Sequence, residues 1–186
     1  MSNLLESVPL RWVVAVVAFP IGGYLGHLIA SPAATAPAAF VSGLVAGAII
    51  GLGQGLALKL PVQALVTWSA VTAVALALSL AGLTAIIGQI ETIPDAIFLG
   101  VASGLLIGAA QAALLVRQRV RSAWTWVLAS TAAWAIGWLV TASIGVDLEA
   151  GWPVYGLSGA LASQLITALA LWRLMPRDEV AGPPPT

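Results

Sequence analysis

Six long apolar stretches, separated by short breaks, constrain the fold of this chain more than any other feature. A helix rises 1.5 Å per residue and the hydrocarbon core of a bilayer is about 30 Å thick, so about 20 apolar residues cross it. Of the 186 residues, 60% are hydrophobic and 8% are charged, whereas roughly a quarter are charged in soluble domains. The sequence predicts an all-α, six-helix transmembrane bundle with short loops in one domain (1–174), followed by a disordered cytoplasmic tail (175–186). The predicted helices are 12–30, 40–58, 62–88, 97–116, 123–145 and 154–174.

The first stretch also has the features of a cleaved signal peptide. Arg11 precedes it, and the small residues Ala30, Ser31 and Ala33 follow it. Its apolar run of about 18 residues is longer than the roughly 7 to 15 typical of a signal peptide. We therefore expect it to remain as the first membrane helix.

The basic residues fall on one side of a six-helix topology. All seven lie at the two termini or in the second and fourth loops, whereas the loops on the other side carry acidic residues and no basic ones. By the positive-inside rule we expect both termini in the cytoplasm, with the protein in the cell (inner) membrane. The basic residues are Arg11, Lys59, Arg117, Arg119, Arg121, Arg173 and Arg177, and the acidic residues opposite them are Glu91, Asp95, Asp147 and Glu149.

An internal repeat links the second and fourth stretches. Tryptophans near the start of the odd-numbered stretches and glutamines near the end of the even-numbered ones extend the pattern, although in the sixth stretch Gly156, Gly159, Ala160 and Ser163 replace the regular glycines. We expect two or three tandem two-helix repeats in one orientation, arranged as a pseudo-three-fold bundle. The matching residues are Gly43, Gly47, Gly51 and Gln54 with Gly100, Gly104, Gly108 and Gln111, each 57 positions apart, and the extended pattern adds Trp12, Trp68, Trp126 and Gln164.

The spacing of these residues places each of the first two glutamines on the same helix face as its glycines. Small residues let membrane helices approach closely, as in a glycine zipper, and polar side chains then form hydrogen bonds across the contact. Gln54, Gln111 and Gln164 have two interpretations: interhelical hydrogen bonds that stabilise the bundle, or a polar ring around a narrow path or a neutral polar ligand. Both need partners, because an unpaired amide in hydrocarbon costs several kcal/mol.

The tandem G-x3-G-x3-G-x2-Q segments followed by tryptophan-led helices resemble a loose group of small, uncharacterised bacterial multi-pass membrane proteins. The likeness covers about Phe40 to Gly145. In that group the glutamine is often followed by tryptophan, whereas here Gly55, Ala112 and Leu165 follow. The resemblance implies a multi-pass bundle and no assigned activity.

The eight tryptophans fall into two groups. Trp134 and Trp138 lie one turn apart inside the fifth stretch, where we expect packing or lipid contact, with an apolar-ligand or pigment surface as the alternative. His27, the only histidine, is predicted to be interfacial. The other six are predicted to anchor helix ends at the lipid headgroups: Trp12, Trp68, Trp124, Trp126 and Trp172 on the cytoplasmic side and Trp152 on the outer side.

Absent motifs narrow the function. No Asp, Glu, Lys or Arg lies in the middle of a predicted span, which argues against proton-coupled transport. The chain has no cysteine and no catalytic, metal or nucleotide motif, so we expect no enzymatic activity, no metal, no cofactor and no nucleic-acid partner. Two functions remain: a scaffold or accessory subunit that packs in the bilayer against another membrane protein or a second copy of itself, or a passive channel or facilitator for a neutral or apolar small solute.

Overall fold

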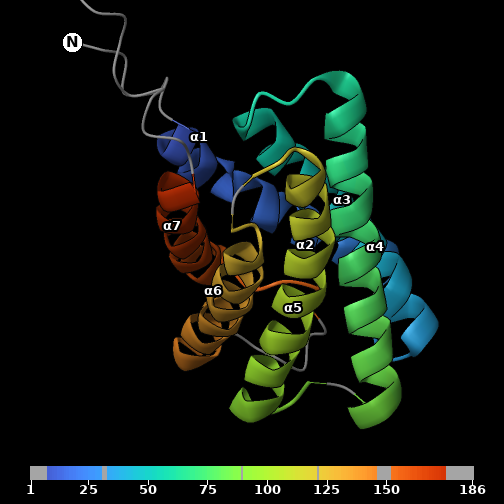
Figure 1. Cartoon of the computed structure of the whole chain (residues 1–186). Coiled ribbons are helices and arrows are strands. Elements are labelled where there is room, and N and C mark those ends of the chain that lie inside the picture. The colour runs from blue at the N-terminus through green and yellow to red at the C-terminus, as the bar shows by residue number, and fades with distance from the viewer. Residues whose placement is uncertain (1–7, 31–32, 89, 121, 146–151, 175–186) are drawn as a thin grey trace, which may run out of the picture.

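The computed structural model describes residues 8–30, 33–88, 90–120, 122–145 and 152–174. Within these ranges the chain is helical, without strands, and its six membrane-length helices match the predicted number (Figure 1). The predicted tail (175–186), Arg121, Asp147, Glu149 and Arg177 lie outside the described residues. The elements are α1 (Val8–Val14), the 3-10 turn η2 (Ala15–Val17), α2 (Ala18–Ala30), α3 (Ala36–Ala57), α4 (Val62–Ile87), α5 (Ile93–Arg117), α6 (Trp124–Ser143) and α7 (Leu157–Leu174).

The first membrane helix is interrupted where the sequence contains Pro20. The 3-10 turn Ala15–Val17 separates α1 from α2 and ends three residues before this proline. Proline has no N–H to donate to the carbonyl four residues earlier, which belongs to Val16, and its ring crowds that carbonyl. The interruption therefore lies in the turn that precedes Pro20.

Helices α3 and α5 begin about four residues earlier than predicted, because their prolines start the helices instead of ending the loops. Pro37 and Pro94 lie in the first turn, where a missing N–H costs nothing. Thr35 and Thr92 are the N-caps, and Thr92 forms a reciprocal capping box with Asp95.

The same two helices end in a left-handed residue with a long basic side chain. Lys59 has φ 54° and Arg119 has φ 62°, a region that favours glycine. In both, the next residue donates its N–H to a carbonyl five residues earlier, Leu60 to Gly55 and Val120 to Leu115. These bonds form Schellman motifs that satisfy the last carbonyls of each helix.

The helices pack in chain order and close into a ring. Each helix contacts the next, and α7 returns to contact α1, η2 and α2, so the first and last helices lie side by side (Figure 1). The most extensive contacts join α3 to α4 and α5 to α6.

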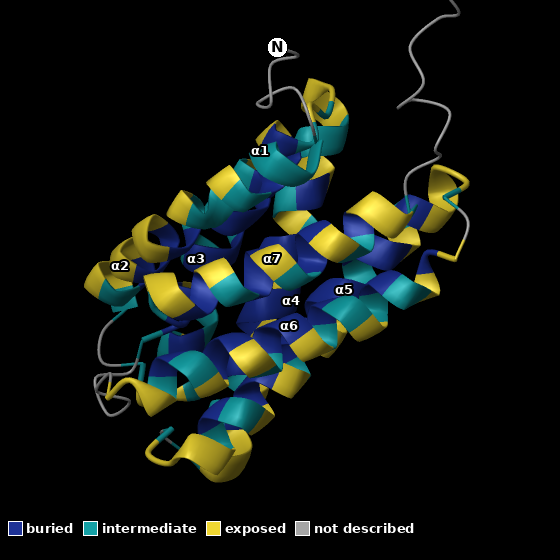
Figure 2. Ribbon diagram, turned by 90° about the vertical axis from the view of Figure 1, so that its left-hand side faces the viewer, coloured by how far each residue is buried: buried dark blue, intermediate teal, exposed yellow. Residues whose placement is uncertain are grey.

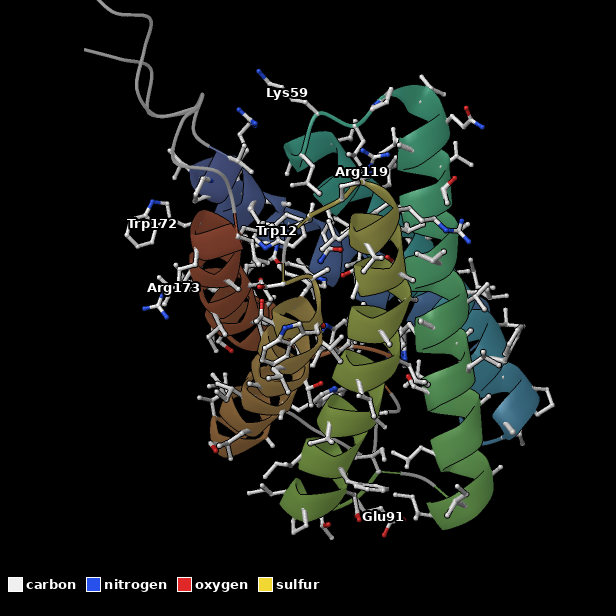
Figure 3. The ribbon with its side chains drawn as sticks, in the orientation of Figure 1. Trp12, Lys59, Glu91, Arg119, Trp172 and Arg173 are labelled. Atoms are coloured by element: carbon white, nitrogen blue, oxygen red, sulfur yellow. The ribbon has the colours of Figure 1, made fainter. Side chains whose placement is uncertain are left out.

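The outer surface carries many large apolar side chains. Val62 is 77% exposed and Ile86 78%, and exposed positions run along the outer faces of the helices around a buried interior (Figure 2). Lys59 and Arg119 lie at one end of the bundle and Glu91 at the other (Figure 3). An apolar belt between charged ends is consistent with a multi-pass membrane protein.

Candidate functional site: an interior hydrogen-bond network and an aromatic cavity

Three of the five glycines of α3 lie directly against the backbone of α4. A Cβ atom added to any of the three would lie 2.7 Å from a Cα atom of α4, a distance that real Cβ atoms do not reach. Close contact of this kind requires glycine, because any side chain would force the two helices apart. The contacting pairs are Gly43 with Ala77, Gly47 with Ala73 and Gly51 with Ser69.

The glycines of α5 contact α6 in the same way. An added Cβ would lie 2.7 to 3.0 Å from a Cα atom of α6, and at Gly104 also 2.6 Å from the carbonyl oxygen of Ser130. The glycine rows therefore set the spacing of both tight helix pairs. The contacting pairs are Gly100 with Ala135, Gly104 with Thr131 and Gly108 with Val127.

Two of the three glutamines meet in the interior. The Gln111 amide nitrogen donates to the side-chain oxygen of Gln54 at 3.0 Å and to the hydroxyl of Thr72 at 2.9 Å. Thr72 in turn donates to the carbonyl oxygen of Trp68 at 2.8 Å. These bonds join α3, α4 and α5 through side chains that are at least 95% buried.

Tryptophans supply the remaining donors of this network. The indole N–H of Trp68 donates to the Gln54 oxygen at 3.3 Å, and that of Trp126 donates to the Gln111 oxygen at 2.9 Å. Both rings are 1% exposed, and Trp12 is fully buried. The prediction that these three tryptophans anchor helix ends at the headgroups is therefore wrong, because their rings face the interior, where the indole N–H groups of Trp68 and Trp126 find amide acceptors.

The third glutamine bonds to the first helix instead of to the other glutamines. The Gln164 amide donates to the backbone oxygen of Trp12 at 2.7 Å, and the Trp12 indole donates to the hydroxyl of Thr167 at 2.8 Å. The rings of Trp12 and Trp126 meet edge to face at 5.5 Å. Each glutamine thus contacts the tryptophan-bearing helix that follows it, and Gln164, in the last helix, contacts the first.

Direct hydrogen bonds fill the space between Gln54 and Gln111. The Gln54 oxygen accepts two bonds, and the Gln111 amide donates two and accepts one. None of the network side chains ionises near neutral pH, so the network can hold helices together but offers no general acid or base. Among the described residues, no group of three or more His, Cys, Asp or Glu side chains lies close enough to hold a metal ion.

A second group of aromatic side chains lies toward the opposite end of the bundle. Tyr155 stacks on Phe19 at 5.5 Å, and Trp134 and Trp138 meet the Tyr155 ring edge to face at 5.0 and 5.9 Å. The Tyr155 hydroxyl donates to Ser163 at 2.7 Å. Trp134 and Trp138 are each 3% exposed, so both belong to this cluster in the protein interior and not to an outer surface.

A partly open cavity of about 320 Å³ adjoins this cluster. It lies between α2, α6 and the segment that enters α7, and Trp138 lines it whereas Trp134 does not. At its edge, Trp152 stacks on His27 with ring centroids 4.3 Å apart. The full lining is Phe19, Pro20, Gly23, Tyr24, Trp138, Thr141, Trp152, Val154, Tyr155 and Gly156.

Two groups in the cavity wall, the indole N–H of Trp138 and the hydroxyl of Thr141, have no hydrogen-bond partner. The indole N–H of Trp138 is buried and unpaired, as are the hydroxyls of Ser42 and Thr141. Each such group costs about 1–3 kcal/mol relative to a paired one. The Thr141 hydroxyl lies against Gly159 in the contact between α6 and α7, which leaves Trp138 as the unpaired donor whose place in the cavity wall is unexplained by helix packing.

Sequence reasoning missed Thr72, which belongs to the hydrogen-bond network, and Tyr155, which belongs to the aromatic cluster. A signal for the glutamine–tryptophan pairs was present. Gln54 and Trp68 lie at similar distances before and after the break at Lys59–Pro61, so an antiparallel hairpin brings them together. Thr72 follows Trp68 by one helical turn and so shares its face. Tyr155 had no such signal, because it precedes the last helix in an irregular segment.

Comparison of the chain with protein-family models, with curated proteins and with solved structures found no match.

Proposed function

We propose that this protein is a non-enzymatic integral membrane protein that acts as a scaffold or accessory subunit. The observation that supports this function is that the interior polar side chains bond to one another. Gln111 contacts Gln54 and Thr72 at hydrogen-bond distance, so no solute fits between them. Amides paired in this way stabilise helix contacts, whereas a path for a polar solute needs amides that exchange partners with it.

We further propose that the protein lies in the cell (inner) membrane, with the basic end of the bundle and both termini on the cytoplasmic side. Lys59 and Arg119 lie at the end opposite Glu91 and Asp95. Retention of lysine and arginine on the cytoplasmic side is the strongest determinant of membrane topology.

A pseudo-three-fold arrangement of helix pairs is also part of this proposal. Each repeat runs from a tryptophan helix to a glutamine helix: α1 and α2 with α3, α4 with α5, and α6 with α7. The glutamine helix of each repeat contacts the tryptophan helix of the next, which gives the contacting pairs α3 with α4, α5 with α6, and α7 with α1. Equivalent contacts support this arrangement, because Gly43 contacts Ala77 in the same way as Gly100 contacts Ala135. The two glycines are 57 residues apart in the sequence and the two alanines 58, which agrees with the repeat length. The third pair has no glycine row and less extensive contacts, as expected if its repeat has diverged.

The test combines recovery of partners with a flux measurement. The full-length chain is purified from native membranes in mild detergent, and the same preparation is reconstituted into liposomes and assayed for glycerol entry by light scattering. A scaffold gives a membrane-protein partner, or a second copy, at fixed stoichiometry, and glycerol entry equal to that of empty liposomes. Glycerol entry above that level, changed by Gln111→Leu but not by Gln164→Leu, would instead establish a facilitator.

A further inference from the structure

We propose that the aromatic cavity binds a neutral, planar, lipid-soluble molecule that carries a carbonyl oxygen, and that this oxygen accepts a hydrogen bond from Trp138. The inference does not depend on the scaffold role. Its basis is the combination of the cavity's aromatic walls, the absence of charge in its lining, its opening and the unpaired indole N–H of Trp138.

Five of the ten residues that line the cavity are aromatic. Phe19, Tyr24, Trp138, Trp152 and Tyr155 all line it, although aromatic residues make up only 7% of the chain. Aromatic rings prefer to stack on, or meet edge to face, another flat ring. The volume of about 320 Å³ is at the lower end of the roughly 300–1,000 Å³ typical of ligand pockets, which suits a compact ring system.

The lining contains no charged side chain, so a charged ligand would lose its hydration without gaining a counter-ion. Two lining residues of the membrane-length helix α2 are exposed on the outside of the bundle, Tyr24 at 55% and Pro20 one turn before it, so this part of the cavity is open to whatever surrounds the helix. A molecule that reaches this opening comes from the lipid phase.

Trp138 supplies the specificity. Its indole N–H is buried without an acceptor, unlike those of Trp12, Trp68 and Trp126, which all donate to protein oxygens. Buried donors in folded proteins are almost always paired, and an unpaired one in a cavity wall indicates a missing acceptor. Because Trp138 lines the cavity, a carbonyl oxygen of a bound molecule can supply this acceptor.

The space itself depends on a small residue at the entrance to α7. A Cβ atom at Gly156 would meet only the Thr141 methyl group, at 3.9 Å, and the glycine has no positive φ. A larger side chain at this position is therefore tolerated by the backbone and occupies the cavity, which provides a blocking variant.

The test uses the full-length chain in lipid nanodiscs with ¹⁵N-labelled tryptophan, and two probes of matched shape. The probes are 2-methyl-1,4-naphthoquinone and 2-methylnaphthalene, which differ in the two carbonyl oxygens. The chain has no cysteine, so the quinone cannot alkylate a thiol. Binding is followed by the indole N–H resonances, and the Trp138→Phe variant assigns the signal of Trp138.

We expect the quinone to shift the Trp138 signal in a saturable way and to bind about fivefold more tightly than 2-methylnaphthalene, as one net hydrogen bond predicts. In Trp138→Phe the two probes should bind equally, and in Gly156→Leu neither should bind. Equal affinity of both probes for the wild-type chain, or no saturable shift with either, would overturn the proposal without any variant. Undiminished binding to a Gly156→Leu protein that retains its helical circular dichroism would also overturn it.

Discussion

Replacement of Gln111 by leucine is the most informative perturbation of the interior network. The two side chains have similar volumes, so the change removes hydrogen bonds without leaving a large cavity. Gln111 takes part in three hydrogen bonds, with Gln54, Thr72 and Trp126. After the change Gln54 keeps its bond from Trp68 and Thr72 keeps its bond to a backbone oxygen, but the Trp126 indole has no acceptor.

The magnitude follows from these contacts. Side-chain hydrogen bonds between membrane helices contribute about 0.6 kcal/mol each on average, so three contribute roughly 2 kcal/mol. The unpaired Trp126 N–H adds a penalty of about 1–3 kcal/mol. We therefore expect Gln111→Leu to lower the free energy of unfolding by roughly 3 kcal/mol or more.

Gln164→Leu is the matched control, because Gln164 donates a single side-chain hydrogen bond, to the backbone oxygen of Trp12. We expect Gln164→Leu to lower the free energy of unfolding by about 1 kcal/mol. Unfolding by sodium dodecyl sulfate in mixed micelles, followed by far-ultraviolet circular dichroism, measures both variants. Equal losses for the two variants, or no loss for Gln111→Leu, would refute the assignment of the network as the main polar contact of the bundle.

Five further substitutions test the packing and the helix ends. Gly104→Ala should lower the free energy of unfolding by about 1–3 kcal/mol, because its methyl group would lie 2.6 Å from a carbonyl oxygen of α6. Gly82→Ala has nothing within 4 Å of the added methyl group, so it should raise the free energy of unfolding by up to about 1 kcal/mol in the same assay. Lys59→Gly and Arg119→Gly should each raise the free energy of unfolding by about 1 kcal/mol, since both residues have a positive φ, and a decrease in both would contradict the Schellman geometry. Thr92→Ala should lower the free energy of unfolding by about 1 kcal/mol and accelerate amide hydrogen exchange in the first turn of α5. Unchanged exchange in that turn would show that the cap does not stabilise the helix.

Some features were ambiguous in the sequence because the same residue type serves two roles. A proline is typical both of a break between helices and of a first helical turn; Pro37 and Pro94 each lie in the first turn of a helix capped by threonine. A tryptophan at a helix end is equally suited to the lipid headgroups and to the interior. Trp124 and Trp172 are more than 60% exposed, whereas Trp126, two residues from Trp124, is buried. The rotation of each helix about its axis decides between these environments.

The sequence by itself determined that this chain forms six apolar helices of membrane-spanning length, because apolar length is a local property that each stretch carries alone. Only the tertiary structure decided that Gln111 bonds to Gln54 and Thr72, and that Trp12 bonds to Thr167, 155 residues away. It also created the cavity beside Trp138, from segments at the start, middle and end of the chain. Local spacing gives each helix a face of small or polar residues, but which faces meet depends on the packing of all the helices at once.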